Sequence, residues 1–319
     1  MMALSVPFCY CDVWNGRHFA GNGVDSNMRT YQAECVVRAG NRLGEGPVWD
    51  ERLGELFWVD IEERRLLRYR PRDGRVADHG FERKIGCAVP AEDGTWILGL
   101  ADGFYRFDPE TEETRLIART DEPDPLNRVN DGKCDPAGRF WAGTMSASWT
   151  RNASLYVLES GGRLMRKLSE VVCSNGLAWT ADGRTMYYID SGERVVWAFD
   201  FDPETGTIAN RRAAIAFPAD EPGGPDGMCI DAEGKLWIGH WGGWQAGRWD
   251  PVTGRKLASV PIPVENVTSC AFGGEHFDEL YITTAGGGSE ANAERQPLAG
   301  GLFRVKVDVP GLPAHRARV

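Results

Sequence analysis

The chain has neither a long hydrophobic run nor a basic cluster. No apolar stretch approaches the ~18 residues that a membrane span requires. The 36 Lys and Arg residues are scattered among 46 Asp and Glu residues, which gives a formal net charge of −10. A nucleic-acid surface needs a basic patch. We therefore expect no membrane segment and no nucleic-acid partner, whereas the acidic balance favours cation binding.

Several catalytic motifs are also missing. The sequence contains no Gly-x-Ser-x-Gly elbow, no P-loop and no dinucleotide fingerprint, so neither serine-nucleophile nor nucleotide chemistry is supported. The 8 cysteines follow no zinc or disulfide spacing, and five of them fall in or beside predicted inner strands. We interpret them as small buried thiols, which predicts a reduced, cytoplasmic protein.

The first part of the chain differs from the rest. Residues 1–27 carry one Arg, no Lys and no repeat, and their short apolar stretch lacks the basic flank of a signal peptide. We expect residues 1–27 to be disordered or to be a spurious N-terminal extension. Residues 28–319 are expected to form one folded domain.

What the sequence does contain is a repeat. A polar or small residue begins a short apolar strand, a turn with Asp and Gly follows, and then comes an aromatic-rich strand. The equivalent first positions are 41 to 51 residues apart and are occupied by Glu45, Gly86, Asn130, Asn175, Asp226 and Ser269. Six repeats of this length, built from short strands, predict an all-β, six-bladed β-propeller with one blade per repeat.

A propeller must close its ring. Residues 31–38 are strand-like and precede the first repeat, and residues 301–308 end the last one. We predict that these two segments share the sheet of the sixth blade, because this pairing removes an exposed edge.

The repeat also predicts a site. Equivalent positions lie at equal height around the axis, so the oxygen-bearing side chains of Glu45, Asn130, Asn175 and Asp226 should meet at one end of the central channel. Carboxylate and amide oxygens suit Ca²⁺, Mg²⁺ or Mn²⁺, and Zn²⁺ also accepts carboxylates. The alternative is structural, since Asn-Gly and Asp-Gly are common turn dipeptides.

Other polar residues are candidates around this site. Arg128 lies two residues before Asn130, on the same face of a strand, where it could bind a substrate oxygen or be an ordinary surface residue. Ser148 belongs to a loop that could cover a substrate. His240 could border the channel or simply be packed, and Asp60 and Asp190 could support the rim.

Several phrases resemble the regucalcin (senescence marker protein)/gluconolactonase/luciferin-regenerating enzyme family. They cover most of the chain from residue 43 to about residue 305, and include Leu43–Trp49, Asn127–Lys133, Ser174–Leu177, Pro225–Trp237, Thr268–Gly273 and Gln296–Gly301. The resemblance implies a six-bladed propeller that binds one divalent metal and hydrolyses sugar-acid lactones. It also implies Glu45, Asn175 and Asp226 as metal ligands and Arg128 and Asn130 as substrate contacts. One departure is that Ser148 stands near the place of a substrate-binding Glu.

The expected function is metal-dependent hydrolysis of an aldono-1,4- or 1,5-lactone, such as gluconolactone, to the aldonic acid. Asp226 would be the catalytic base, and Arg128, Asn130 and Ser148 would contact the substrate. The partner is a small sugar lactone, and the protein is expected to be a monomer or a weak homo-oligomer. Two alternatives remain: a non-catalytic Ca²⁺-binding regulatory propeller, and a metal-dependent esterase or organophosphate hydrolase on the same scaffold.

Overall fold

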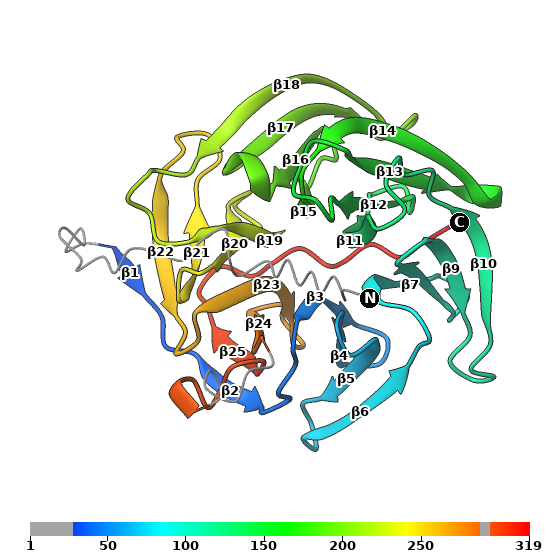
Figure 1. Ribbon diagram of the computed structural model, residues 1–319. Helices are drawn as coiled ribbons and strands as arrows, with labels where there is room; N and C mark the ends of the chain where they lie inside the picture. Colours follow the sequence, from blue (N-terminus) through cyan, green and yellow to red (C-terminus); the bar gives the residue numbers. More distant parts are fainter. Residues whose placement is uncertain (1–27, 288–293) are drawn as a thin grey trace, which may run out of the picture.

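Six β-sheets are arranged around a central channel in the computed structural model, which describes residues 28–287 and 294–319 (Figure 1). Each sheet is one blade, and the fold confirms the predicted six-bladed propeller. The predicted extension, residues 1–27, lies outside the described residues. Within the part of the chain that is described, no helix is long and apolar enough to cross a membrane.

Each of the first five blades is a consecutive four-stranded meander, to which the fifth adds a short extra strand. Blades one to three consist of β3 (Gly44–Asp50), β4 (Glu55–Asp60), β5 (Arg65–Arg70) and β6 (Arg75–Gly80); β7 (Ile85–Pro90), β8 (Trp96–Leu100), β9 (Gly103–Phe107) and β10 (Thr114–Arg119); and β11 (Arg128–Cys134), β12 (Phe140–Met145), β13 (Ala153–Glu159) and β14 (Arg163–Val171).

The remaining blades follow the same plan, with short 3₁₀ turns at Ser160–Gly162 and Ser191–Glu193. Blades four to six consist of β15 (Ser174–Trp179), β16 (Thr185–Asp190), β17 (Val195–Asp202) and β18 (Thr207–Ala216); β19 (Gly224–Ile230), β20 (Leu236–Trp241), β21 (Gln245–Trp249) and β22 (Lys256–Pro261); and β23 (Asn266–Gly273), β24 (Glu279–Ala285), β25 (Leu302–Lys306) and β2 (Glu34–Val37). The inner strands, β3, β7, β11, β15, β19 and β23, surround the channel.

The segment before the first repeat and the last strand of the final repeat meet in the sixth blade, as predicted. Strand β2 pairs antiparallel with β25 and supplies the outer edge of the sheet. The predicted strand over residues 31–38 was too long, however. A separate strand β1 (Arg29–Thr30) pairs in parallel with β22, and the Tyr31 backbone N–H also donates to Ser259 O (2.9 Å). The segment therefore spans blades five and six, because the Tyr31 ring packs on Trp237 of blade five.

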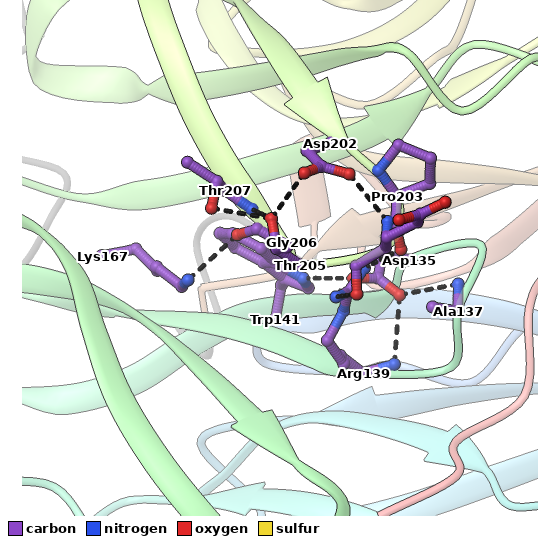
Figure 2. A network of polar contacts seen from close by, with 11 residues as sticks. Asp135, Ala137, Arg139, Trp141, Lys167, Asp202, Pro203, Thr205, Gly206 and Thr207 are labelled. Atoms are coloured by element: carbon purple, nitrogen blue, oxygen red, sulfur yellow. Dashed lines mark hydrogen bonds and ion pairs between the residues drawn. The ribbon is translucent and has the colours of Figure 1, made fainter.

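The Asp–Gly turn and the following aromatic strand form one structural device (Figure 2). One oxygen of Asp135 accepts backbone N–H groups of the turn, from Ala137 (2.9 Å) and Arg139 (3.1 Å), while the other accepts the Trp141 indole N–H (2.8 Å). Asp231 makes the same contact with the Trp237 indole, at 3.0 Å. These buried aspartates are therefore fully used in holding the first hairpins of blades three and five.

Side chains of blade three also reach blade four. Arg139 donates to Pro203 O (2.7 Å), and Lys167 donates to Gly206 O (2.9 Å), both in the β17–β18 hairpin (Figure 2). Beneath them lies one of the apolar layers between neighbouring blades, in which Trp141 contacts Phe201 edge-to-face with ring centroids 5.9 Å apart. Such pairs add about 0.5–1.5 kcal/mol to the gain from burial.

A C-terminal tail, residues 310–319, crosses the ring after the last strand (Figure 1, red). Its backbone bonds to blade five through Pro310 O and Ala232 N (2.8 Å), and to blade two through Ala317 N and Pro90 O (2.9 Å). These partners lie at the ends of the inner strands. At Gly311 the tail passes so close to Phe272 that an added Cβ would lie 2.0 Å from its ring. No sequence pattern predicted this crossing.

The tail covers a cavity of about 90 Å³ in the channel. The inner strands form its walls, and tail residues 312–315 form one side. The described cysteines are free thiols, as predicted, and Cys134 and Cys229 line this cavity. The channel therefore has one end closed by the chain itself.

Candidate metal centre

A break in strand pairing turns the candidate side chains into the channel. In every blade the register between the inner strand and its neighbour shifts at the aligned position, for example between Glu45 and Val48 and between Pro225 and Met228. The other four inner strands shift at the equivalent places. A bulge leaves residues unpaired and re-aims their side chains. The shared bulge thus places Glu45, Asn130, Asn175 and Asp226 at one height.

The turn explanation of the Asn-Gly and Asp-Gly pairs is wrong. Both pairs lie within inner strands, Asn175 in β15 and Asp226 in β19. The glycines serve close approach instead: a Cβ on Gly227 would lie 2.0 Å from Ser269 Oγ of the next blade. These dipeptides let inner strands pack together while presenting a polar side chain to the channel.

A chain of hydrogen bonds runs across three blades at this end of the channel. Arg128 Nη1 donates to Asn130 Oδ1 (2.7 Å), which confirms that the two side chains share a face. Asn130 Nδ2 donates to Asn175 Oδ1 (3.1 Å), and Asn175 Nδ2 donates to Ser191 Oγ (2.8 Å). Ser191 in turn donates to Pro225 O (2.8 Å). The two amides are therefore held in fixed orientations.

Three carboxyl groups lie near this amide chain and act on one another. Burial, followed by the nearby Asp131 carboxylate, raises the pKa of Glu45 to about 8. Burial and then Glu45 and Asp131 raise the pKa of Asp226 well above its ordinary value, against an opposing effect of Arg128. Burial also raises the pKa of Asp131. A concentration of buried negative charge of this kind is stabilised by a bound cation.

The donor set fits a divalent cation with oxygen ligands. Asp226 is 3% exposed, and its carboxylate makes no hydrogen bond or ion pair with any described residue. Glu45 uses one oxygen for the N–H of Gly46 (2.9 Å). No three His, Cys, Asp or Glu side chains of the described chain are grouped closely enough to hold a metal. A site here consequently needs the Asn175 amide oxygen beside the two carboxylates.

Ser148 lies in a loop beside this centre and is exposed. Its hydroxyl bonds to Thr150 Oγ1 (2.9 Å) and Ser146 Oγ (3.2 Å). Asn127, which directly precedes Arg128 in the chain, ties this loop to the site. Its Oδ1 accepts the backbone N–H of Ala147 (3.0 Å). A substrate role for Ser148 stays a prediction.

The remaining polar candidates have structural positions. His240 is fully buried between Phe217 and Trp249, and burial lowers its pKa to about 3. It is therefore a packed residue of blade five. Asp60 and Asp190 support the rim as predicted, because each accepts backbone N–H groups of the segment that leads into an inner strand, including Leu43 N (3.2 Å) and Cys173 N (2.9 Å).

Sequence reasoning missed three residues of this region. Ser191 carried no signal, because its role depends on its place between Asn175 and Pro225. Asp131 and Lys133 did carry a sequence signal, because they are charged at positions of the aligned repeat where the other blades have small or apolar residues.

Three comparisons place the chain among known proteins. The profile described as "SMP-30/Gluconolactonase/LRE-like region" matches residues 43–286. Regucalcin of Danio rerio is 41% identical over 293 residues, which cover 90% of this chain and 99% of that protein.

Two solved structures share the fold over nearly their whole length. A luciferin-regenerating enzyme superposes with a TM-score of 0.83 at 31% identity, covering 90% of this chain and 99% of that one. A regucalcin from Agrobacterium tumefaciens, described as a calcium-binding protein, superposes with a TM-score of 0.86 at 26% identity, covering 91% and 99%.

Proposed function

The chain belongs to the SMP-30/gluconolactonase/LRE-like family, and on this premise we propose that it is a metal-dependent lactonase. Its substrate would be a sugar-acid lactone, an aldono-1,4- or 1,5-lactone such as gluconolactone, and its product the aldonic acid. The observation that carries the proposal is the buried Asp226 carboxylate, which makes no hydrogen bond with any described residue and lies beside Glu45 and the Arg128–Asn130–Asn175 chain.

Glu45, Asn175 and Asp226 would hold one divalent cation, Ca²⁺, Zn²⁺, Mg²⁺ or Mn²⁺. When bound, such a cation polarises a lactone carbonyl and stabilises the negative charge that develops on its oxygen. Three protein ligands leave coordination positions open, as in catalytic rather than structural sites. This openness favours catalysis over a purely structural ion.

Asp226 would act as the base. Its carboxylate would take a proton from the attacking water while the water oxygen bonds to the lactone carbonyl carbon. The ester bond to the ring oxygen then breaks, and the proton passes from Asp226 to that oxygen, giving a hydroxyl and a carboxylic acid that releases its own proton to the solvent. The buried position of Asp226 supports this role because a desolvated carboxylate has a raised pKa and holds a proton more readily.

Arg128, Asn130 and Ser148 would orient the substrate. The Arg128 guanidinium is fixed by its bond to Asn130 Oδ1 (2.7 Å). Burial raises the pKa values of Glu45 and Asp226, and the charge of Arg128 opposes both rises, so it acts on the proposed metal centre. Positioned donors of this kind suit the hydroxyl and ring oxygens of a polyol and lower the entropic cost of reaction.

A second candidate is a Ca²⁺-binding propeller without catalysis. The calcium-binding description of the Agrobacterium tumefaciens regucalcin favours it. A third possibility, an esterase or organophosphate hydrolase, shares the scaffold but receives no support from the polar surroundings of Arg128 and Asn130.

The test is lactone opening, followed by acid release. EDTA-treated protein receives Zn²⁺, Mn²⁺, Mg²⁺ or Ca²⁺ in turn and is offered glucono-, galactono-, xylono- and arabinonolactones. We expect turnover that depends on the added metal. Metal binding without turnover on any lactone would favour the Ca²⁺-binding candidate, whereas turnover of an aryl ester alone would favour the third.

A further inference from the structure

At two positions of the inner strand, blade three has a charged residue where every other blade has an uncharged one. Counted from the aligned site position, the next residue is Asp131 in blade three, and the third is Lys133. In the other five blades the corresponding pairs are Gly46 and Val48, Cys87 and Val89, Gly176 and Ala178, Gly227 and Cys229, and Cys270 and Phe272. This asymmetry is not needed for the fold, because five blades are built without it.

Asp131 differs from the structural aspartate four residues later. Asp135 uses both oxygens, as Figure 2 shows. Asp131 Oδ1 accepts the N–H of Gly132 (2.7 Å), but its Oδ2 is buried with no hydrogen-bond partner in the described chain. An unpartnered buried carboxylate oxygen costs about 1–3 kcal/mol or more. Its retention within reach of Glu45 and Asp226 indicates a role that involves charge.

Lys133 reaches from blade three to blade five. Its Nζ donates to the carbonyl oxygen of Met228 on β19, so it joins blade three to blade five. Burial raises the pKa values of Glu45 in blade one, Asp131 in blade three and Cys229 in blade five, and the charge of Lys133 opposes each rise. An ammonium that acts on alternate blades lies near the axis.

The position of Lys133 divides the channel. Glu45 and Asp226 lie at the starts of their strands, whereas Lys133 lies further along and lines the cavity of about 90 Å³ that the tail closes. In the described chain the Lys133 ammonium contacts a neutral backbone carbonyl, that of Met228, and no carboxylate lies within ion-pair distance. Its charge therefore acts on more than one carboxylate and is not paired with any single one.

We propose that Lys133 is a built-in counter-cation beneath the metal centre and that, together with Asp131, it sets how tightly the centre binds a divalent cation. This inference rests on the cation-binding part of the proposed function. Lys133 would offset carboxylate repulsion in the metal-free protein and repel the bound cation, whereas Asp131 would attract that cation without being one of its three ligands. Both residues are thus positioning residues.

Two substitutions should shift the binding constant in opposite directions. Lys133→Met keeps the length of the side chain and removes the charge, so the dissociation constant should fall at least about tenfold, because the cation loses a repulsive neighbour. The same substitution should lower the Tm of EDTA-treated protein, because the carboxylates lose an attractive charge. Asp131→Asn should raise the dissociation constant by at least about tenfold and raise the metal-free Tm.

The measurement is calorimetric titration with Ca²⁺, Mn²⁺ and Zn²⁺, each alone, together with thermal unfolding in EDTA. The matched control is Lys167→Met, since Lys167 also donates to a backbone carbonyl of another blade but lies on β14, away from the channel. A merely structural role would weaken binding and lower the Tm together. Tighter cation binding together with a lower metal-free Tm is expected only if the charge of Lys133 is responsible.

The outcomes separate this inference from the proposed function. If wild-type protein binds none of the three cations, the metal-dependent function and this inference both fail. If wild-type protein binds a cation and Lys133→Met binds it no more tightly, the inference alone is overturned. Should Lys133→Met fail to fold, Asp131→Asn decides: an unchanged dissociation constant overturns the proposal, and a weakened one supports it.

Discussion

The two ends of the channel are built from different parts of the chain. At the starts of the inner strands, side chains from four blades converge, and their carboxylates have raised pKa values. At the other ends of the same strands, the tail closes the channel mainly through backbone contacts, such as Leu312 N to Ile230 O (3.3 Å) and Arg318 N to Gly138 O (2.8 Å).

The tail end contributes mainly to the stability of the fold, whereas the other end holds the groups that could bind a ligand or react. Backbone bonds at the tail end satisfy polar groups and connect blades that are distant in sequence, so they contribute to the fold. The candidate metal end, at the starts of these strands, instead leaves Asp131 Oδ2 buried without a hydrogen-bond partner in the described chain. Such unsatisfied groups cost stability and are retained where they bind or react. Substitutions at the two ends should therefore have separable effects.

The largest effect is expected at the metal end. Asp226→Asn keeps the shape of the side chain and removes the proposed base and one ligand charge, so turnover on a lactone should fall by at least about 10³-fold at saturating metal. The Tm of EDTA-treated protein should not fall, because a buried charge without a hydrogen bond is lost. Acid release and thermal unfolding measure the two quantities.

The control for this variant is Asp200→Asn, which makes the same change at an exposed residue of β17 paired with Arg212. It should leave turnover unchanged. Metal-loaded Asp226→Asn with turnover near that of wild type would remove Asp226 from the mechanism.

The clustering of the candidate side chains at one end was predictable from sequence, their metal-binding role stays a prediction, and the tail crossing at the other end was not predicted. Four oxygen-bearing residues stood at one place in a repeat, and symmetry alone converts that placement into a cluster. The tail belongs to no repeat, and its contacts join Pro310 to Ala232 and Ala317 to Pro90, pairings that only the three-dimensional path creates. The strand predicted over residues 31–38 was too long for a similar reason, because Tyr31 packs on Trp237 of blade five, a contact that the sequence does not reveal.

The second effect is expected at the tail end. Ending the chain after Val309 removes the tail, its backbone bonds and the buried pair between Arg316 and Asp50. With each bond contributing about 1 kcal/mol, the Tm should fall by roughly 10 °C. Cation affinity should stay within about threefold of wild type, because a distant contact shares no partner with the metal centre.

A milder variant provides the control. Arg318→Ala removes one exposed ion pair, with Glu92 at 3.3 Å, and should cost less than about 1 kcal/mol. A truncated protein that unfolds at the wild-type temperature would show that the tail only covers the channel. A truncated protein that no longer binds a cation would show that the two ends are coupled.

The third effect is a pH dependence of stability that is present without metal and lost when a cation is bound. Folded, metal-free protein holds a proton on Glu45 up to a pKa of about 8, whereas the unfolded chain loses it near 4.5. Between these values the folded state binds more protons, so the free energy of unfolding should fall as pH rises. A saturating cation keeps Glu45 ionised in the folded state, as it is in the unfolded chain at these pH values, so this dependence on pH should disappear.

Urea unfolding from pH 5 to 9, in EDTA and in excess Ca²⁺, measures both slopes. Glu45→Gln should flatten the metal-free dependence, because it removes the titrating group. A metal-free stability that rises with pH across this window would contradict the shift of the Glu45 pKa.

The smallest effect is expected at Ser148, on the loop that borders the metal end. In the proposed site its hydroxyl would contribute one neutral hydrogen bond to the substrate, worth about 1 kcal/mol, so Ser148→Ala should lower kcat/KM about fivefold, mostly through KM. Among the residues that the structure describes, the exposed hydroxyl bonds only within its loop, to Ser146 and Thr150, so the Tm should not change. An unchanged kcat/KM on every lactone would remove Ser148 from the substrate site and leave Arg128 and Asn130 as its polar contacts.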